Sequence, residues 1–216
     1  MSSVAAPRPA SHFASYAQQS HAASLGMWVF LATELMFFGP LFFGYTYGRL
    51  HYPEGYADAS RHTDVLLGTI NTAVLLTSSA FMAAAVAARR LDAPRGAQWL
   101  LYVTAALGVV FLGIKGTEYV HEWSEHLVPA LHFAFSGQHG TAVEHFFYMY
   151  FAMTLLHALH LTIGIVLTLV FAVALQRNAT GFASAERLEV AGLYWHFVDS
   201  VWIVLYPILY LVGRSA

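Results

Sequence analysis

Five long apolar stretches constrain the fold of this chain more than any other feature of its sequence. They run roughly over residues 25–47, 65–88, 99–120, 146–175 and 193–212. A helix needs about 20 predominantly apolar residues to cross the hydrocarbon core of a bilayer. Over such lengths only a helix satisfies its own backbone hydrogen bonds in lipid, whereas a β-barrel would need shorter alternating strands. The sequence therefore predicts an all-α integral membrane protein, a bundle of five transmembrane helices.

The composition agrees with a membrane protein. Only 10% of the residues are Asp, Glu, Lys or Arg, against about 25% in soluble domains. This shortage of charge argues against a disordered chain, a soluble enzyme and a nucleic-acid-binding protein. The chain has no Cys, which excludes disulfides, thiolate nucleophiles and Cys-ligated zinc or iron–sulfur centres.

The chain divides into a short arm and one membrane domain. Residues 1–22, rich in Ser, Ala and Pro, are expected to form a loosely ordered N-terminal arm, and residues 23–216 the five-helix membrane domain. With five spans, the arm shares one side of the membrane with the loops after the second and fourth spans. That side holds Arg8, Arg89, Arg90, Arg95, Arg177 and Arg187, whereas the other side holds Arg49, Arg61 and Arg214. Because cytoplasmic loops are enriched in Arg and Lys, we expect the N-terminus inside and the C-terminus outside.

Several ionisable residues fall within the predicted spans, where polar groups are costly and are candidates for function. They are Glu34 on the first span, Lys115 and Glu118 on the third, His157 and His160 on the fourth, and His196 and Asp199 on the fifth. Glu34 lies near the midplane, where a lone carboxylate is expected to be protonated or hydrogen-bonded. It would either hold helices together or form a site for protons or lipid headgroups.

Two pairs of these residues are spaced three apart on one helical face. Lys115 and Glu118 are expected to form an ion pair, and their position near the outer end of the span would let the Lys side chain reach toward water. We favour a structural role for this pair over a role in transport. His196 and Asp199 are expected to form a buried polar pair, since no catalytic nucleophile accompanies them.

The pair His157 and His160 raises the question of a bound metal. Two His one turn apart on one helix cannot occupy opposite faces of a single haem iron. A di-metal centre in a helical bundle needs two Glu-x-x-His motifs and two further Glu, and only Glu118–His121 matches such a motif. We therefore expect no metal ligand, no cofactor-binding residue and no catalytic residue in this chain. The ionisable residues of the spans, Lys115 apart, are predicted to be buried polar or lipid-associated.

Five motifs on five separate spans resemble those of subunit III of the haem-copper oxidases. Tyr194–Trp202 resembles the last-helix signature Y-W-H-F-V-D-x-V-W of that family. His157–Gly164 is similar to H-G-L-H-V-x-x-G, and Thr33–Gly39 to S-E-x-x-F-F-x-G. Ile70–Ser79 is similar to L-N-T-x-x-L-L-x-S-S, and Glu118–Tyr119 matches the family's E-Y.

The resemblance implies a non-catalytic subunit of a bacterial terminal oxidase that reduces oxygen to water in the inner membrane. In that family, subunit III packs against subunit I, which holds the haems and copper. It carries phospholipids in a cleft between two helix groups, sustains proton uptake and protects subunit I from inactivation. By position, Glu34 corresponds to the family's buried carboxylate, and His157 and His160 to its pair near the lipid cleft.

Three departures from the family pattern stand out. Members of the mitochondrial type have seven spans, and this chain lacks the first two. Lys115 stands where the mitochondrial type has Gln. The family's inner-end Arg on the fourth span aligns with Ala174, and Arg177 follows three residues later. The sequence therefore does not decide which residue of this chain would contact a lipid headgroup.

Three alternatives stay open at this point. An accessory subunit III-like protein of nitric oxide reductase shares all of these motifs. A small proton-coupled transporter would use Glu34 and the His pair, although transporters often contain internal repeats and this chain has none of 20–50 residues. A membrane di-iron oxygenase would need more ligands than the sequence offers.

Overall fold

The computed structural model describes residues 13–129, 133–135, 137, 139–179, 181–211 and 213. Within this part, every regular element is helical. In chain order they are α1 (Tyr16–His51), α2 (Pro53–Arg61), α3 (Val65–Arg90), α4 (Pro94–Ser124), α5 (Gly140–Gln176), α6 (Ala185–Tyr206) and the π-helical turn η1 (Pro207–Leu211). Helices α1, α3, α4, α5 and α6 are long and apolar enough to cross a membrane. The predicted all-α fold with five spans is thus confirmed.

Short polar residues and prolines set the helix starts. The side chains of Ser15, Asp64 and Ser184 accept hydrogen bonds from backbone N–H groups in the first turns of α1, α3 and α6. Helices α2 and α4 instead begin with Pro53 and Pro94. A proline is tolerated at this position because the first N–H groups of a helix have no partner within the helix, so the N–H that proline lacks is not needed.

The first helix is longer than its apolar stretch. It begins at Tyr16, after the Ser15 cap, inside the stretch 1–22 for which we expect an arm. Residues 1–12 of that stretch lie outside the described residues.

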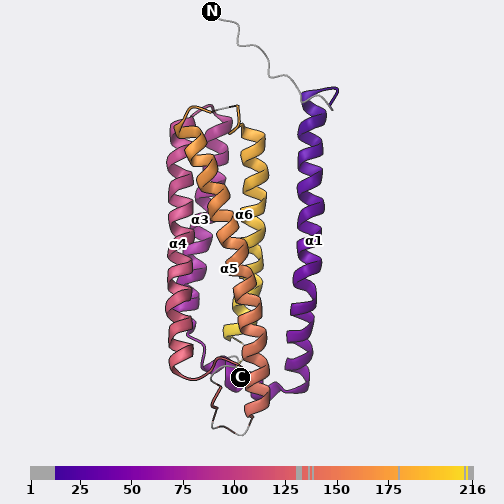
Figure 1. Cartoon of the computed structure of the whole chain (residues 1–216), viewed down its shortest axis with the longest axis vertical. Coiled ribbons are helices and arrows are strands. Elements are labelled where there is room, and N and C mark those ends of the chain that lie inside the picture. Colours follow the sequence, from indigo (N-terminus) through magenta and orange to yellow (C-terminus); the bar gives the residue numbers. More distant parts are fainter. Residues whose placement is uncertain are drawn as a thin grey trace, which may run out of the picture.

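The five long helices do not pack equally (Figure 1). Helix α3 packs against α4 and α6, and α5 packs against α4 and α6, so that these four form one bundle. Helix α1 stands to one side of the bundle, where it contacts α5 and α6. Only 6% of the most apolar 18 residues of α1 are buried, against 28–50% in the other four spans.

Large aromatic side chains fill the centre of the bundle. Trp195 and Trp202 of α6 are 1% and 0% exposed. Gly108 of α4 and Gly164 of α5 make room for Trp195, because a Cβ at these positions would lie 3.0 Å and 3.2 Å from its indole ring. The Trp of the last-helix motif therefore packs directly against two glycines of neighbouring helices.

The short helix α2 lies across the end of the bundle where α1 ends and α3 begins (Figure 1). It packs against the start of α5, where the Tyr56 hydroxyl lies 2.6 Å from Nδ1 of His145. Burial raises the pKa of Tyr56 to about 12, so the hydroxyl keeps its proton at neutral pH. Gly55 permits this approach, since a Cβ there would lie 2.4 Å from the Cβ of Ala142.

We expect Gly55→Ala to destabilise the protein by about 1–3 kcal/mol, because the added methyl group overpacks the contact between α2 and α5. Gly113→Ala is the matched control, since a Cβ there meets nothing within 4 Å and Ala favours a helix over Gly by about 1 kcal/mol. Thermal unfolding in detergent should place the midpoint of Gly55→Ala below the wild type and that of Gly113→Ala at or above it. Equal midpoints for both variants would show that α2 does not pack against α5 in this way.

Candidate functional site

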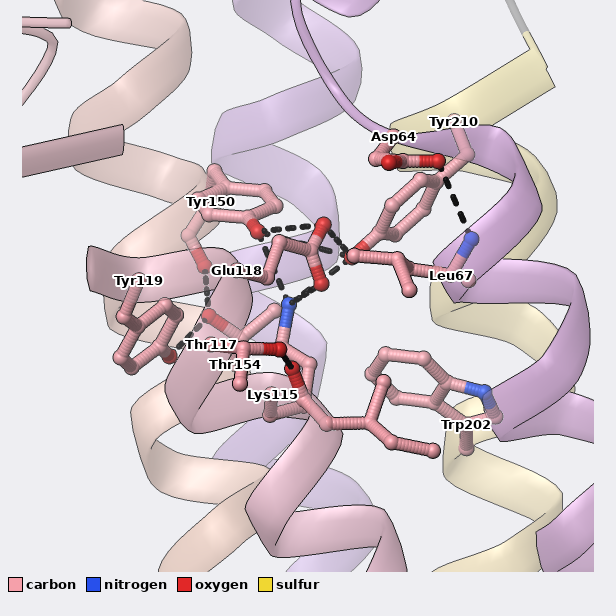
Figure 2. Close-up of polar contacts among 12 residues, drawn as sticks. Asp64, Leu67, Lys115, Thr117, Glu118, Tyr119, Tyr150, Thr154, Trp202 and Tyr210 are labelled. Atoms are coloured by element: carbon pink, nitrogen blue, oxygen red, sulfur yellow. Dashed lines mark hydrogen bonds and ion pairs between the residues drawn. The ribbon is translucent and has the colours of Figure 1, made fainter. Parts of the chain in front are cut away.

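A buried polar network surrounds Lys115 of α4 (Figure 2), and η1 contributes Tyr210 to it. Its ammonium Nζ lies 2.9 Å from Oε2 of Glu118, 2.8 Å from the Tyr150 hydroxyl and 2.8 Å from the Tyr210 hydroxyl. Lys115 and Glu118 are 3% and 2% exposed. The predicted ion pair is confirmed, but the Lys side chain points into the bundle and does not reach toward water.

The hydrogen bonds of this network form a closed set. The Lys115 ammonium donates its three hydrogen bonds to one carboxylate oxygen and two hydroxyls. The Tyr150 and Tyr210 hydroxyls in turn donate to the other carboxylate oxygen, Oε1 of Glu118, at 3.1 Å and 2.6 Å. Every charge in the set is therefore both paired and hydrogen-bonded, the condition under which a buried ion pair is tolerated.

Glu122 is a buried carboxyl group that sequence reasoning missed. It lies one helical turn after Glu118 and is 2% exposed. Lys115, Glu118 and the Tyr150 hydroxyl are close enough to act on its carboxyl group, although its carboxyl oxygens have no hydrogen bond of ordinary geometry to any described residue. Its position four residues after Glu118 places both carboxyl groups on one face of the helix, and this spacing was the one sequence feature that could have indicated its burial.

Glu34 of α1 is hydrogen-bonded to α5, as expected for a carboxyl group near the midplane. Its Oε2 lies 2.9 Å from Nε2 of His160. Nδ1 of His160 lies 2.8 Å from the Leu156 carbonyl oxygen, and because a carbonyl only accepts, Nδ1 carries a hydrogen. One proton is then shared between Nε2 and Glu34, either on the imidazolium or on a neutral carboxyl group.

The two His of α5 face different surroundings. His157 is 1% exposed and packs against the rings of Phe111 and Trp202, at centroid distances of 5.5 Å and 5.1 Å, and these two rings also contact each other. Neither ring nitrogen of His157 has a hydrogen-bond partner in the described part of the chain. His160 instead faces α1, so the pair does not converge on one ligand. Across the described ranges, no group of three or more His, Asp or Glu is arranged to hold a metal ion.

The predicted pairing of His196 with Asp199 is wrong. Nδ1 of His196 lies 2.7 Å from the hydroxyl of Ser79 on α3, and the structure contains no hydrogen bond from His196 to Asp199. Asp199 is 3% exposed, and its carboxyl oxygens have no hydrogen bond of ordinary geometry to any described residue, although the Ser79 hydroxyl is close enough to act on them. A spacing of three places two side chains on neighbouring parts of a helix surface but does not orient them toward each other.

The motifs of α3 and α6 contact each other directly. The indole N–H of Trp195 donates to the Ser78 hydroxyl at 3.2 Å, and that of Trp202 donates to the Thr72 hydroxyl at 3.0 Å. Two motifs more than 100 residues apart in the sequence therefore serve one interface between helices.

A cleft of about 550 Å³ lies between α1 on one side and α5 and α6 on the other. Its walls are mostly apolar, and Glu34 and His160 lie in it together with Tyr194, whose hydroxyl donates to the His160 carbonyl at 3.0 Å. Arg187, near the start of α6, lines the cleft and also a smaller adjoining cavity of about 230 Å³. That smaller cavity is more polar and includes His21 and Ser184.

Five helices that are long and apolar enough to cross a membrane define the class of this chain, a multi-pass helical membrane protein. Residues 12–214 match the family model of cytochrome c oxidase subunit III. The chain belongs to this family and is thereby a subunit of a haem-copper oxidase complex.

Relatives with assigned names agree with this membership. The chain is 32% identical to cytochrome c oxidase subunit 3 of Thermostichus vulcanus, over 88% of this chain and 87% of the relative. It is 29% identical to cytochrome c oxidase subunit 3 of Alkalihalophilus pseudofirmus, over 88% and 86%. It is 28% identical to the probable quinol oxidase subunit 3 of Staphylococcus aureus, over 88% of both chains. These relatives favour the oxidase interpretation over a nitric oxide reductase accessory protein, a transporter or an oxygenase.

Proposed function

We propose that this chain is a non-catalytic subunit III that packs against subunit I of a bacterial oxidase and holds phospholipid beside it. The haems and copper of subunit I would carry out the reduction of oxygen to water. The residues of this chain would bind lipid, maintain the fold and support proton uptake by the partner. The bacterial inner membrane is the location that this role requires.

The cleft between α1 and α5–α6 is the observation that carries the proposal. Residues of α1, α5 and α6 form its walls. Its apolar walls suit acyl chains, and its volume of about 550 Å³ falls within the range of about 300–1,000 Å³ typical of ligand pockets.

Arg187 supplies a positive charge for a lipid headgroup at the mouth of this cleft. The family's inner-end Arg aligns with Ala174 in this chain, so that position has no cation. Arg187 lies instead between the apolar cleft and the polar cavity that adjoins it. A phosphate beside Arg187 would place the acyl chains along the cleft toward Glu34 and His160.

The proposed orientation, with the N-terminus inside, rests on the positive-inside rule. Arg89, Arg90 and Arg187 lie at the end of the bundle where α3 ends and α6 begins. Arg8 and Arg214, which also enter the count of charges, lie outside the described residues.

Removal of the subunit from the oxidase complex tests the proposal. We expect the remaining complex to reduce oxygen, but with slower proton uptake and a shorter working life during turnover, because the redox centres lie in the partner. Oxygen consumption over many turnovers would measure both effects, with the subunit restored from a plasmid as the control. Complete loss of activity in a complex whose haems are fully assembled would contradict a non-catalytic role.

A further inference from the structure

A second groove, of about 490 Å³, lies between α3 and α6. Residues 189, 192, 193 and 196 of α6 line it, whereas residues 187, 190, 191 and 194 line the cleft beside α1. At 3.6 residues per turn, these two sets occupy opposite faces of α6. The groove therefore faces away from the cleft of the proposed function, although Glu189 and Leu193 also line the polar cavity beside Arg187.

Small side chains create the groove. Ala83 and Ala87 of α3 and Gly192 of α6 line it, with Val86 and Leu193 as apolar walls. Among the described residues that line it, only Arg90 and Glu189 are charged. His196 lies seven residues beyond Glu189, which is about 10 Å further along the helix axis. The groove thus combines one charged mouth with an apolar channel, the pattern that suits an amphiphile.

The mouth carries two opposite charges. Arg90 Nη2 lies 2.6 Å from Oε2 of Glu189, and the two side chains are 57% and 46% exposed. Exposed ion pairs contribute little to stability, so each partner can also contact a charge from outside. The neighbouring cation Arg89 points elsewhere, toward Asp92 and the Ala183 carbonyl.

We propose that this groove binds phosphatidylethanolamine, with the phosphate on Arg90 and the primary ammonium on Glu189. One acyl chain would lie along Ala83, Ala87 and Gly192 toward His196. A zwitterionic headgroup satisfies both charges of the mouth. An anionic phospholipid would leave Glu189 beside a phosphate, and a choline headgroup has no N–H to donate to the carboxylate.

Lipid retention by the intact oxidase complex tests the proposal. The complex is placed in nanodiscs that contain equal amounts of phosphatidylethanolamine, phosphatidylglycerol and phosphatidylcholine. Lipids that stay bound after transfer to mild detergent are identified and counted by native mass spectrometry. We expect Glu189→Gln to lower the bound ratio of phosphatidylethanolamine to phosphatidylglycerol several-fold, because Arg90 is then unopposed. Arg90→Gln should reduce the retention of both. Arg95→Gln, an exposed Arg of α4 outside the groove, is the matched control and should change neither.

Two further variants separate this site from the cleft and from a merely structural effect. Ala87→Phe fills the groove without touching its charges and should release the same lipid from an assembled complex. Arg187→Gln changes the cleft and should leave the lipid of the groove in place. The proposal is overturned if Glu189→Gln leaves the lipid ratio unchanged, or if Ala87→Phe releases no lipid. It is also overturned if cross-links from position 87 show that a helix of another oxidase subunit covers the groove.

Discussion

Replacement of Lys115 by Met is expected to destabilise the folded subunit by about 3–5 kcal/mol. The ammonium of Lys115 is the only cation bonded to the Glu118 carboxylate within the described residues. Without it, an ionised carboxylate would stay buried, with only the Tyr150 and Tyr210 hydroxyls as donors. Thermal unfolding of the purified subunit, together with its yield in the membrane, measures the loss.

A double variant separates the loss of the charge pair from the loss of packing. Lys115→Met combined with Glu118→Gln leaves no unpaired charge, so it should recover much of the stability that Lys115→Met removes. Tyr210→Phe removes a single donor to the carboxylate and should cost about 1.5–3 kcal/mol. If the double variant were as unstable as the sum of both single variants, the two residues would not be coupled and the closed network would be wrong.

The second large effect is expected at Glu34. Glu34→Ala leaves Nε2 of His160 without a partner and opens a cavity between α1 and α5, at a cost of about 2–4 kcal/mol. Glu34→Gln keeps a side chain of the same shape, whose amide can donate to Nε2 of a neutral His160, and should assemble almost normally. Unfolding midpoints and co-purification with the partner subunits measure both variants.

A hydrophobic carbodiimide tests the state of Glu34 independently. This reagent needs a protonated carboxyl group that it can reach from the apolar phase. Glu34 lines the cleft and is 18% exposed, whereas Glu118 and Glu122 are buried inside the bundle. Peptide mapping should therefore find the label on Glu34 in preference to Glu54, Glu186 or Glu122. Labelling elsewhere, or equal damage from Glu34→Gln and Glu34→Ala, would favour an ionised Glu34 that pairs with the imidazolium of His160 or with another subunit.

Features that depend on short stretches of sequence could be predicted, and features that depend on neighbours could not. The number of spans follows from five apolar stretches, and the Lys115–Glu118 pair follows from one helical turn. Tyr150 and Tyr210 escaped prediction because they come from α5 and η1, 35 and 95 residues away from Lys115. Nothing in their local sequence distinguishes them from other aromatic residues of a membrane span.

The His residues show the same limit. Spacing alone placed His157 and His160 on one helix, but which neighbour each one meets depends on how α1 and α6 pack against α5. His160 meets Glu34, 126 residues away, and His157 meets Trp202. For His196, the partner Ser79 lies 117 residues away, so the nearer Asp199 was the wrong choice.

The sparse packing of α1 affects how this subunit joins its complex. A helix with few buried contacts gains little from its own chain that would fix its tilt and rotation. We therefore expect α1 of the free subunit to sample a range of tilts, whereas α3–α6 already hold their final arrangement. Docking against a neighbouring subunit would then select one tilt, and the entropy lost in that step would reduce the net affinity. Subunit association would in this way complete the folding of α1.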